Sequence, residues 1–246
     1  MAVWVIVTVF IIGTVVLYFA VSGKKAILPV FQESIDPEPY IARCVRQASS
    51  AALDRMLPQG GFMVPTPHVA YQGRNVTYVC MTRARYEPCV MQHPMYVEEV
   101  QAELEKSIAP EIEECFLTLK EELEQRGANV DMDEQRVQVE FIPRRVQISV
   151  ERKMRINEKG ARRTFERVDT AIAHPAYDLA LVATEIANQE ATYCSFEYVG
   201  YMILYPVFDI QKVALSDGTK VYTVKDIATL QALTIATRGC VIPLGI

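Results

Sequence analysis

The sequence VQVEFIPRRVQISVERKMRI, at residues 137–156, indicates the fold class because its hydrophobic residues recur at every second position. Such alternation is typical of strands that have one face in a core and the other in water. Pro143 separates two strands in this stretch, and a turn at residues 157–160 leads to a third strand at residues 162–172. The sequence therefore predicts an antiparallel meander.

The outward face of this meander is rich in arginine, but glutamates are interleaved with the arginines. We therefore expect cross-strand ion pairs there rather than a basic binding patch. The charged residues expected on this face are Arg144, Arg145, Arg152, Arg155, Arg162, Arg163 and Arg167 with Glu140, Glu151, Glu158 and Glu166.

Two long helices are predicted upstream of the meander, where apolar residues recur every three or four positions. The first begins after Asp36, a capping residue followed by Pro37, and ends at residues 58–61, which include a proline and two glycines. The second covers residues 96–126, and Pro110 is expected to kink or divide it. Its outer faces hold ten glutamates, which we interpret as a solvated surface.

Between the two helices, residues 62–94 contain four prolines and show no strong period. We expect an irregular loop with a hairpin clipped by Cys80 and Cys89, and loops of this length often carry recognition.

The chain after the meander predicts one more helix and then strands. Pro175 suits the first turn of a helix that extends to about Gln189. From Cys194 onward the pattern is strand-like, and Asp217-Gly218 between apolar alternations indicates a hairpin.

The N-terminal stretch AVWVIVTVFIIGTVVLYFAV, at residues 2–21, carries no charge and no proline. A helix of about twenty apolar residues matches a hydrocarbon core of about 30 Å, and Trp4 and Tyr18 suit its two interfaces. We therefore expect a single transmembrane anchor in contact with membrane lipid. A juxtamembrane linker at residues 22–35 and a soluble domain at residues 36–246 would follow it.

Two other interpretations of residues 2–21 remain open, namely a cleaved signal peptide and a buried core helix. Ala20-Val21-Ser22 could serve as a cleavage site, but no Lys or Arg precedes the apolar run, and the run is longer than that of a usual signal. A core helix without a polar face would be unusual in a domain of this size.

The predicted fold class is α+β, with a single N-terminal transmembrane helix followed by helices packed on an antiparallel sheet. Within the soluble domain we expect a helical part at residues 36–126, and a part at residues 127–246 made mainly of antiparallel strands with one helix. The net charge of −5 argues against a nucleic-acid partner, because such binding depends on cationic contacts with phosphates.

The six cysteines are an even number, which suits disulfides in an oxidising compartment, although six buried free thiols are the alternative. Sequence spacing does not choose among the many pairings. Our working assignment joins Cys44 with Cys115, Cys80 with Cys89, and Cys194 with Cys240.

Different sequence features favour opposite sides of the membrane for the soluble domain. Lys24 and Lys25 follow the apolar stretch, which favours a cytoplasmic domain by the positive-inside rule. The cysteines and the sequon at Asn75, a candidate glycosylation site, favour an extracellular domain. We expect the extracellular arrangement.

The sequence holds no recognisable catalytic or cofactor motif. Its histidines are His68, His93 and His174, none of which forms an HExxH pattern, and no phosphate-binding glycine motif occurs. Cys80, Cys89 and His93 would form a metal centre only if folding brought them together. We therefore expect no catalytic residue, no metal and no cofactor.

Four segments occur in a recognisable order along residues 1–200. A cysteine helix ends in Gln59-Gly60-Gly61-Phe62, an acidic helix bears Cys115, and the strands VQVEFI and VQISVE precede the helix YDLALVATEIANQE. Together with the single N-terminal span, this order resembles a family of uncharacterised archaeal membrane proteins. The resemblance implies one anchor, an α+β ectodomain and a surface location, and it supplies no catalytic residues.

We therefore expect a membrane-anchored cell-surface protein with a structural, binding or self-assembly role, whose partner is another protein or a second copy in a homo-oligomer. One alternative is a membrane-bound enzyme with a cysteine or metal centre. The other is a cytoplasm-facing scaffold, which the two lysines after the apolar stretch would favour.

Overall fold

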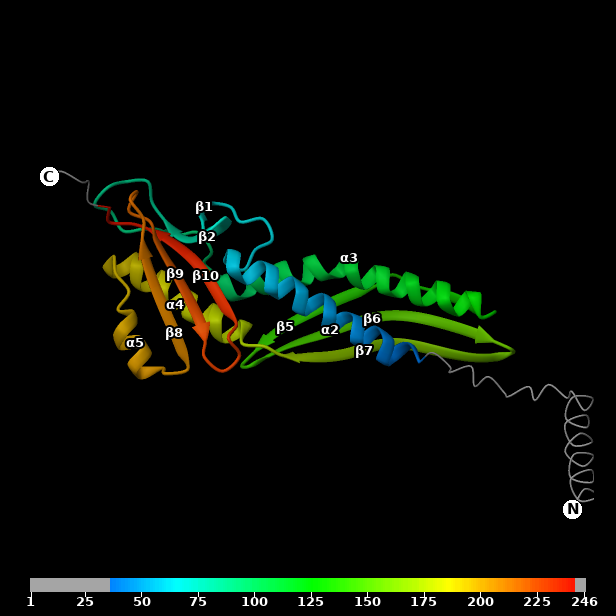
Figure 1. Cartoon of the computed structure of the whole chain (residues 1–246). Coiled ribbons are helices and arrows are strands. Elements are labelled where there is room, and N and C mark those ends of the chain that lie inside the picture. The colour runs from blue at the N-terminus through cyan, green and yellow to red at the C-terminus, as the bar shows by residue number, and fades with distance from the viewer. Residues whose placement is uncertain (1–35, 242–246) are drawn as a thin grey trace, which may run out of the picture. The chain divides into compact units, whose positions relative to one another are not determined.

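In the computed structural model, which describes residues 36–241, four α-helices pack against two β-sheets (Figure 1). This arrangement confirms the α+β class. The predicted anchor at residues 2–21 and the predicted linker at residues 22–35 lie outside the described residues. Within the described range, no helix is long and apolar enough to cross a membrane.

The first described helix, α2 (Pro37–Met56), begins and ends where the sequence predicts. The Asp36 side chain accepts a hydrogen bond from the Glu38 backbone N–H at 3.4 Å, and Pro37 occupies the first turn, where its missing donor costs nothing. One face of α2 is buried, and a 3₁₀ turn, η1 (Leu57–Gln59), follows it.

Helix α3 (Tyr96–Gln125) continues across Pro110, so of the two expected effects of this proline, a kink or a division, the division does not occur. The residues on both sides of the proline, Ile108 and Ile112, are fully buried in the same apolar stripe. Packing along this stripe holds the helix together, although proline removes one backbone donor. In the same region the Gln135 side chain donates to the Ala109 carbonyl at 2.6 Å.

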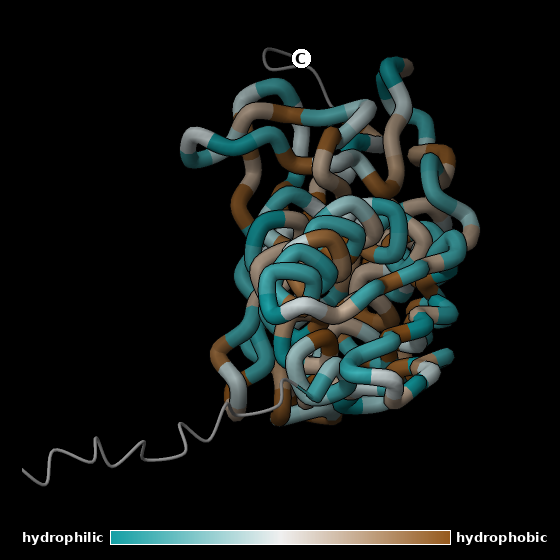
Figure 2. The backbone as a smooth tube through the Cα atoms, turned by 90° about the vertical axis from the view of Figure 1, so that its right-hand side faces the viewer, coloured by the Kyte–Doolittle hydropathy of each residue, from teal (hydrophilic) through white to brown (hydrophobic). Residues whose placement is uncertain are grey.

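The antiparallel sheet contains β4 (Asn129–Met132), β5 (Arg136–Ile142), β6 (Arg145–Glu158) and β7 (Ala161–Ala173). Strand β6 lies in the middle, with β7 along one edge and both β5 and β4 along the other. The predicted meander is therefore confirmed. In Figure 2 hydrophobic and hydrophilic residues alternate along the tube, as expected for elements that each bury one face.

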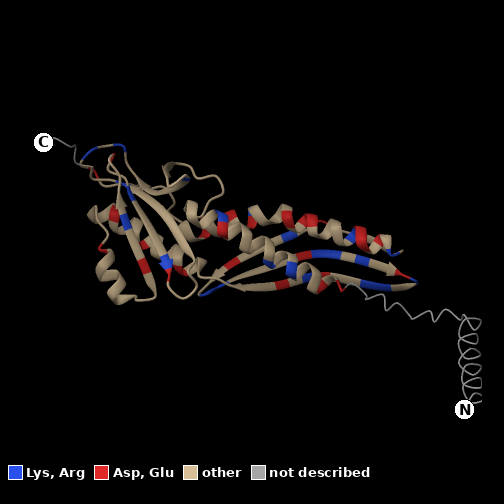
Figure 3. Cartoon of the chain, viewed as in Figure 1, with Lys and Arg blue, Asp and Glu red and all other residues tan. Residues whose placement is uncertain are grey.

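Basic and acidic residues are interleaved along this sheet, as Figure 3 shows, and their side chains form ion pairs as predicted. The pairs are Lys153–Glu166, Arg155–Asp131, Arg155–Asp133, Arg163–Glu158, Arg167–Glu151 and Arg167–Asp169, at 2.6 to 3.7 Å. They are solvent-exposed, so each contributes little to stability.

Arg152 is an exception, because it lies in the core and not on the outer face where we expected it. It shares the side of β6 that carries Val150 and Met154, since side chains on a strand alternate. Its guanidinium donates to both carboxylate oxygens of Glu113, at 2.7 and 3.1 Å, and its Nε donates to the Asp133 carbonyl. This bidentate contact compensates for the burial of the charge.

Helix α3 also covers the free edge of β5. The Val139 N–H donates to the Glu105 carboxylate at 3.2 Å, and the Phe141 N–H donates to the Gln101 side-chain oxygen at 2.9 Å. These bonds replace those of a missing neighbouring strand. The interpretation of the α3 glutamates as a solvated surface is therefore wrong for Glu105, and also for Glu113, which binds buried Arg152.

The second sheet is mixed and has six strands, in the order β1-β2-β10-β9-β8 with β3 beside β2. The strands are β1 (His68–Tyr71), β2 (Arg74–Met81), β3 (Val90–Met91), β8 (Phe208–Ala214), β9 (Lys220–Asp226) and β10 (Ala232–Arg238). The predicted hairpin at Asp217-Gly218 joins β8 to β9. The prediction of an exclusively antiparallel sheet is wrong here, because β2 and β10 are parallel.

Strand β2 corrects the prediction of an irregular loop at residues 62–94, because that segment contributes three strands. Five consecutive residues of β2, 76–80, are buried, so the strand shows no alternation that would reveal it. Its partner β10 lies more than 150 residues later in the chain. The hairpin between β2 and β3, clipped by Cys80 and Cys89, does occur as predicted.

Two helices follow the antiparallel sheet, where we expected one. Helix α4 (Ala176–Tyr193) matches the prediction and packs against the mixed sheet. Helix α5 (Tyr198–Leu204) replaces a predicted strand. A short apolar run fits either element, and here the Tyr201 ring contacts Phe196 at 5.3 Å and Tyr205, four residues on, at 4.6 Å.

Two glycines allow α2, α3 and the mixed sheet to meet. Gly60 and Gly61 have φ angles of 84° and 83°, in the left-handed region. A Cβ on Gly60 would lie 2.8 Å from the Thr77 Cβ of β2, and a Cβ on Gly61 would lie 2.5 Å from Val100 of α3. The Tyr96 hydroxyl donates to the Gly60 carbonyl at 3.0 Å. The missing side chains thus permit a three-way contact.

We predict that Gly60→Ala lowers the free energy of unfolding by about 2–4 kcal/mol, because it combines left-handed strain of about 1 kcal/mol with a steric overlap. Gly73→Ala is the matched control, since Gly73 has a φ of 76° but nothing within 4 Å of an added Cβ. It should cost only about 1 kcal/mol. Urea unfolding of both variants checks this, and equal losses would contradict the steric explanation.

Candidate functional site

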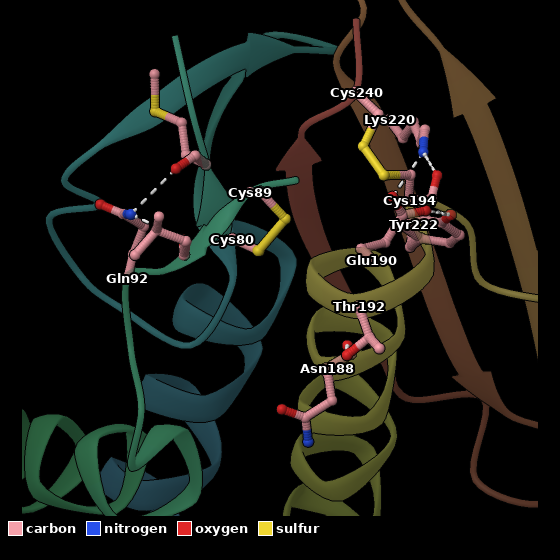
Figure 4. Close-up of a disulfide and its surroundings, with 12 residues drawn as sticks. Cys80, Cys89, Gln92, Asn188, Glu190, Thr192, Cys194, Lys220, Tyr222 and Cys240 are labelled. Atoms are coloured by element: carbon pink, nitrogen blue, oxygen red, sulfur yellow. Dashed lines mark hydrogen bonds and ion pairs between the residues drawn. A yellow bond between two sulfur atoms is a disulfide. The ribbon is translucent and has the colours of Figure 1, made fainter. Parts of the chain in front are cut away.

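The six cysteines form three disulfides, in the pairs of our working assignment. Cys44–Cys115 joins α2 to α3. Figure 4 shows the other two: Cys80–Cys89 joins β2 to the segment before β3, and Cys194–Cys240 joins the end of α4 to the segment after β10. The Cα–Cα distances are 6.5, 5.3 and 5.8 Å, respectively. Cys44–Cys115 and Cys194–Cys240 connect segments 71 and 46 residues apart, whereas Cys80–Cys89 lies within the hairpin of β2 and β3.

The residues of the hypothetical metal centre are in other contacts. Cys80 and Cys89 are bonded to each other, so in this state neither sulfur is a thiolate. His93 stacks on Phe62 at 4.5 Å, and its Nδ1 lies 2.6 Å from the Glu99 carboxylate. Within residues 36–241, no three His, Cys, Asp or Glu side chains are grouped so as to hold a metal ion.

A buried polar cluster lies beside the Cys194–Cys240 disulfide (Figure 4). Glu190, which is fully buried on α4, accepts hydrogen bonds from the Tyr222 hydroxyl and from Lys220 Nζ on β9. Lys220 Nζ also donates to the Cys194 carbonyl. Burial, and then the hydrogen bond to Glu190, raises the pKa of Tyr222, which keeps its hydroxyl a donor.

This cluster holds the C-terminal end of α4 in place. Cys194 caps α4 in the left-handed conformation, with a φ of 59°, and its carbonyl would otherwise lack a partner at the helix end. Lys220 donates to both Glu190 and the Cys194 carbonyl, and Tyr222 donates to Glu190, so a structural role accounts for the contacts of this cluster.

A hollow of about 670 Å³ beside this cluster is bordered by three cations. Two of them are already bonded: Lys220 to Glu190, and Arg238 to the Asp217 and Thr82 carbonyls. The third, Arg85, lies in the segment that runs beside Val241. The hollow therefore offers little free positive charge to an anionic ligand.

A second polar cluster lies between the two sheets. Arg144, in the turn between β5 and β6, binds the Asp226 carboxylate at the end of β9, and its backbone carbonyl accepts from the His174 N–H. Burial works to raise the pKa of Asp226, but hydrogen bonds from Arg144 and Thr229 outweigh burial and lower that pKa. These contacts connect the antiparallel sheet to the mixed sheet.

His174 is buried in this cluster and is neutral. Its Nδ1 accepts a hydrogen bond from the Ala176 N–H at 3.1 Å, so the proton of the neutral ring is on Nε2. Burial lowers its pKa from 6.5 to about 4, although Asp54 and Asp226 act in the opposite direction. His174 is therefore a structural residue that resists protonation.

We predict that the free energy of unfolding falls between pH 6.5 and pH 4. In this range the unfolded chain binds a proton at His174 and the folded chain does not, so stability is complete above pH 6.5 and up to about 3 kcal/mol is lost towards pH 4. The lowered pKa values of Asp169 and Asp226 act only below about pH 3.8. His174→Asn, whose side-chain oxygen can replace Nδ1, should flatten the dependence in urea unfolding. An unchanged slope would contradict the assignment.

The candidate glycosylation residue Asn75 is exposed on β2, next to the turn at Gln72 and Gly73. Thr77, the third residue of the sequon, is fully buried. The folded chain therefore has room for a glycan at Asn75, and its occupancy stays a prediction.

The structure reveals an exposed apolar surface that the sequence analysis missed. We name it the α5 surface and define it as Val199, Ile203, Leu204, Tyr205, Val207, Ile227 and Leu230, which are 49 to 76% exposed. An adjoining hollow of about 480 Å³ is lined by Met202, Pro206, Phe208, Asp209, Lys225, Ile227 and Leu230. The signal in the sequence was the apolar run YVGYMIL, which we interpreted as part of a strand.

Comparison of the chain with protein-family models, with curated proteins and with solved structures found no match. The function is therefore argued from the described geometry and the sequence.

We predict that a disulfide stabilises the fold more when it encloses a longer stretch of chain, with a logarithmic dependence on the length of that stretch. Cys44–Cys115 spans 71 residues and Cys80–Cys89 spans 9. Loop-closure entropy then gives losses of about 4 and about 2.5 kcal/mol when each pair is replaced by alanine. Urea unfolding of the two double variants, with the other disulfides intact, checks this order. A larger loss for the short loop would contradict it.

Proposed function

We propose that this chain is a membrane-anchored, single-pass cell-surface protein whose disulfide-bonded domain lies outside the cell and has a binding and assembly role. The observation that carries the proposal is the pairing of all six cysteines, because disulfides persist in oxidising compartments. Cys44–Cys115 and Cys194–Cys240 enclose 71 and 46 residues, so they restrict the unfolded chain and stabilise the domain.

Two further observations support this role. The uncharged stretch at residues 2–21 has the length and composition of a transmembrane anchor. The resemblance of the chain to archaeal membrane proteins with one such anchor also supports this interpretation. The charged residues of the two polar clusters are paired within the described domain. The apolar side chains of the α5 surface, by contrast, are left exposed there. An exposed apolar surface of this kind marks an interaction site more often than a catalytic one.

We predict that protease added to intact cells removes peptides beyond residue 35 when a reductant is present. Without a reductant the disulfide-bonded domain should resist cleavage. In a separate sample, reduction outside the cell should expose its cysteines to a thiol reagent that cannot cross membranes. Mass spectrometry of the shaved cells follows both. Protection until the cells are lysed would favour the cytoplasm-facing scaffold, and a known cytoplasmic protein serves as the control for cell integrity.

A further inference from the structure

The α5 surface consists of apolar side chains that the other described residues leave exposed. No residue of α5 is buried, and Ile203 and Leu204 are 76 and 75% exposed. A helix in a globular protein normally buries one apolar stripe. Tyr201 and Met202 hold α5 against the domain, through Phe196 and through the Ile210 N–H at 3.1 Å. The opposite side of α5 is left facing solvent.

An unusual backbone conformation presents a second part of this surface. Leu230 has a φ of 64°, which is strained for a residue with a branched side chain, and it is 66% exposed. The turn that holds it is firmly bonded, since the Thr229 N–H and hydroxyl both donate to buried Asp226 at 2.8 Å. A rigid turn thus displays a large apolar side chain where glycine or asparagine would be easier to accommodate. Strain of this kind often marks a functional position.

The surface combines protruding and recessed apolar features. Ile203 and Leu204 project from α5, and the 480 Å³ hollow lined by Met202, Ile227 and Leu230 adjoins the same helix. A two-fold axis through this region would place the protruding residues of one copy against the hollow of the other, and would do so twice. This is the self-complementarity that an isologous contact requires.

Charge and area also favour a second copy over a charged partner. Helix α5 carries no charge, and appears entirely uncoloured in Figure 3. The hollow has one acid, Asp209, and one base, Lys225, so a partner of either sign gains little attraction. In a two-fold pair each acid can face the other copy's base. The exposed side chains cover on the order of 800 Å², which is what one partner contributes to a standard interface.

The α5 surface lies far from the start of the described chain. Helix α2 has 20 residues, which is about 30 Å, and only its C-terminal end, at η1, reaches the mixed sheet. Figure 1 places α5 and the first turn of α2 at opposite ends of the described residues. A contact at α5 therefore leaves Asp36, where the linker joins, free of the interface.

We propose that the α5 surface is a homodimer contact, in which Ile203 and Leu204 of each copy fill the hollow of the other. The inference deepens the proposed assembly role, on which it rests, by naming the partner as a second copy of this chain.

The test uses the full chain, purified in detergent, with a photoreactive benzoylphenylalanine at position 203. Unlabelled and ¹⁵N-labelled chains are mixed before irradiation. We expect cross-linked peptide pairs that contain one labelled and one unlabelled member and that join position 203 to residues 225–231. Cross-links confined to one chain, or formed to detergent or lipid, would overturn the proposal.

Two variants separate the contact from fold stability. Leu204→Glu should weaken the association at least tenfold, while Val64→Glu, an 81% exposed residue near the opposite edge of the mixed sheet, should leave it unchanged. Leu230→Gly should weaken the association but preserve or raise the melting temperature, because glycine accepts the positive φ. Light scattering with detergent subtracted measures the mass. A dimer that persists in both Leu204→Glu and Leu230→Gly excludes α5 as the contact.

The outcome is independent of the location test. A monomeric chain that protease removes from intact cells refutes only the dimer, and a dimeric chain that stays protected in intact cells refutes only the surface location.

Discussion

The close approach of backbone at Gly60 and Gly61 is the constraint on which the rest of the fold depends. Here the end of α2 contacts β2 on one side and α3 on the other, at distances that exclude a Cβ atom. The Tyr96 hydroxyl closes the contact by donating to the Gly60 carbonyl, with its ring buried. Because α2 and α3 also cover the antiparallel sheet, this junction sets the position of one sheet relative to the other.

Several charged groups within the described domain have specific internal partners. Arg152 reaches Glu113, Glu190 gathers Lys220 and Tyr222, and Asp226 binds Arg144. Groups paired in this way stabilise one arrangement of the elements, because leaving any member unpaired in the interior is costly. The same pairing leaves few polar groups to act on a ligand. The uncharged α5 surface, by contrast, is exposed and has no such internal partner among the described residues.

Local sequence patterns predicted the elements whose partners are near in the chain. The alternation after Val137 gave the meander, the spacing around Cys44 and Cys115 gave two helices, and Asp217-Gly218 gave a hairpin. Three features escaped prediction. Strand β2 is buried on both faces, so it shows no alternation. Arg152 is charged, yet it occupies a buried position in the alternation of β6. The run beginning at Tyr198 is apolar enough for either a strand or a helix.

Of the candidate functional features, the sequence predicted only the disulfides and the candidate glycosylation site. The cysteines and the exposed sequon at Asn75 were visible as residues, whereas the α5 surface exists because a helix, a turn and a strand edge meet. The sequence by itself determined the α+β class, the periodic helices and the meander, since periodicity is a property of neighbouring residues. The tertiary structure alone decided the parallel pairing of β2 with β10, the pairing of Arg152 with Glu113 and the exposure of α5. These depend on contacts between distant residues, which periodicity does not encode.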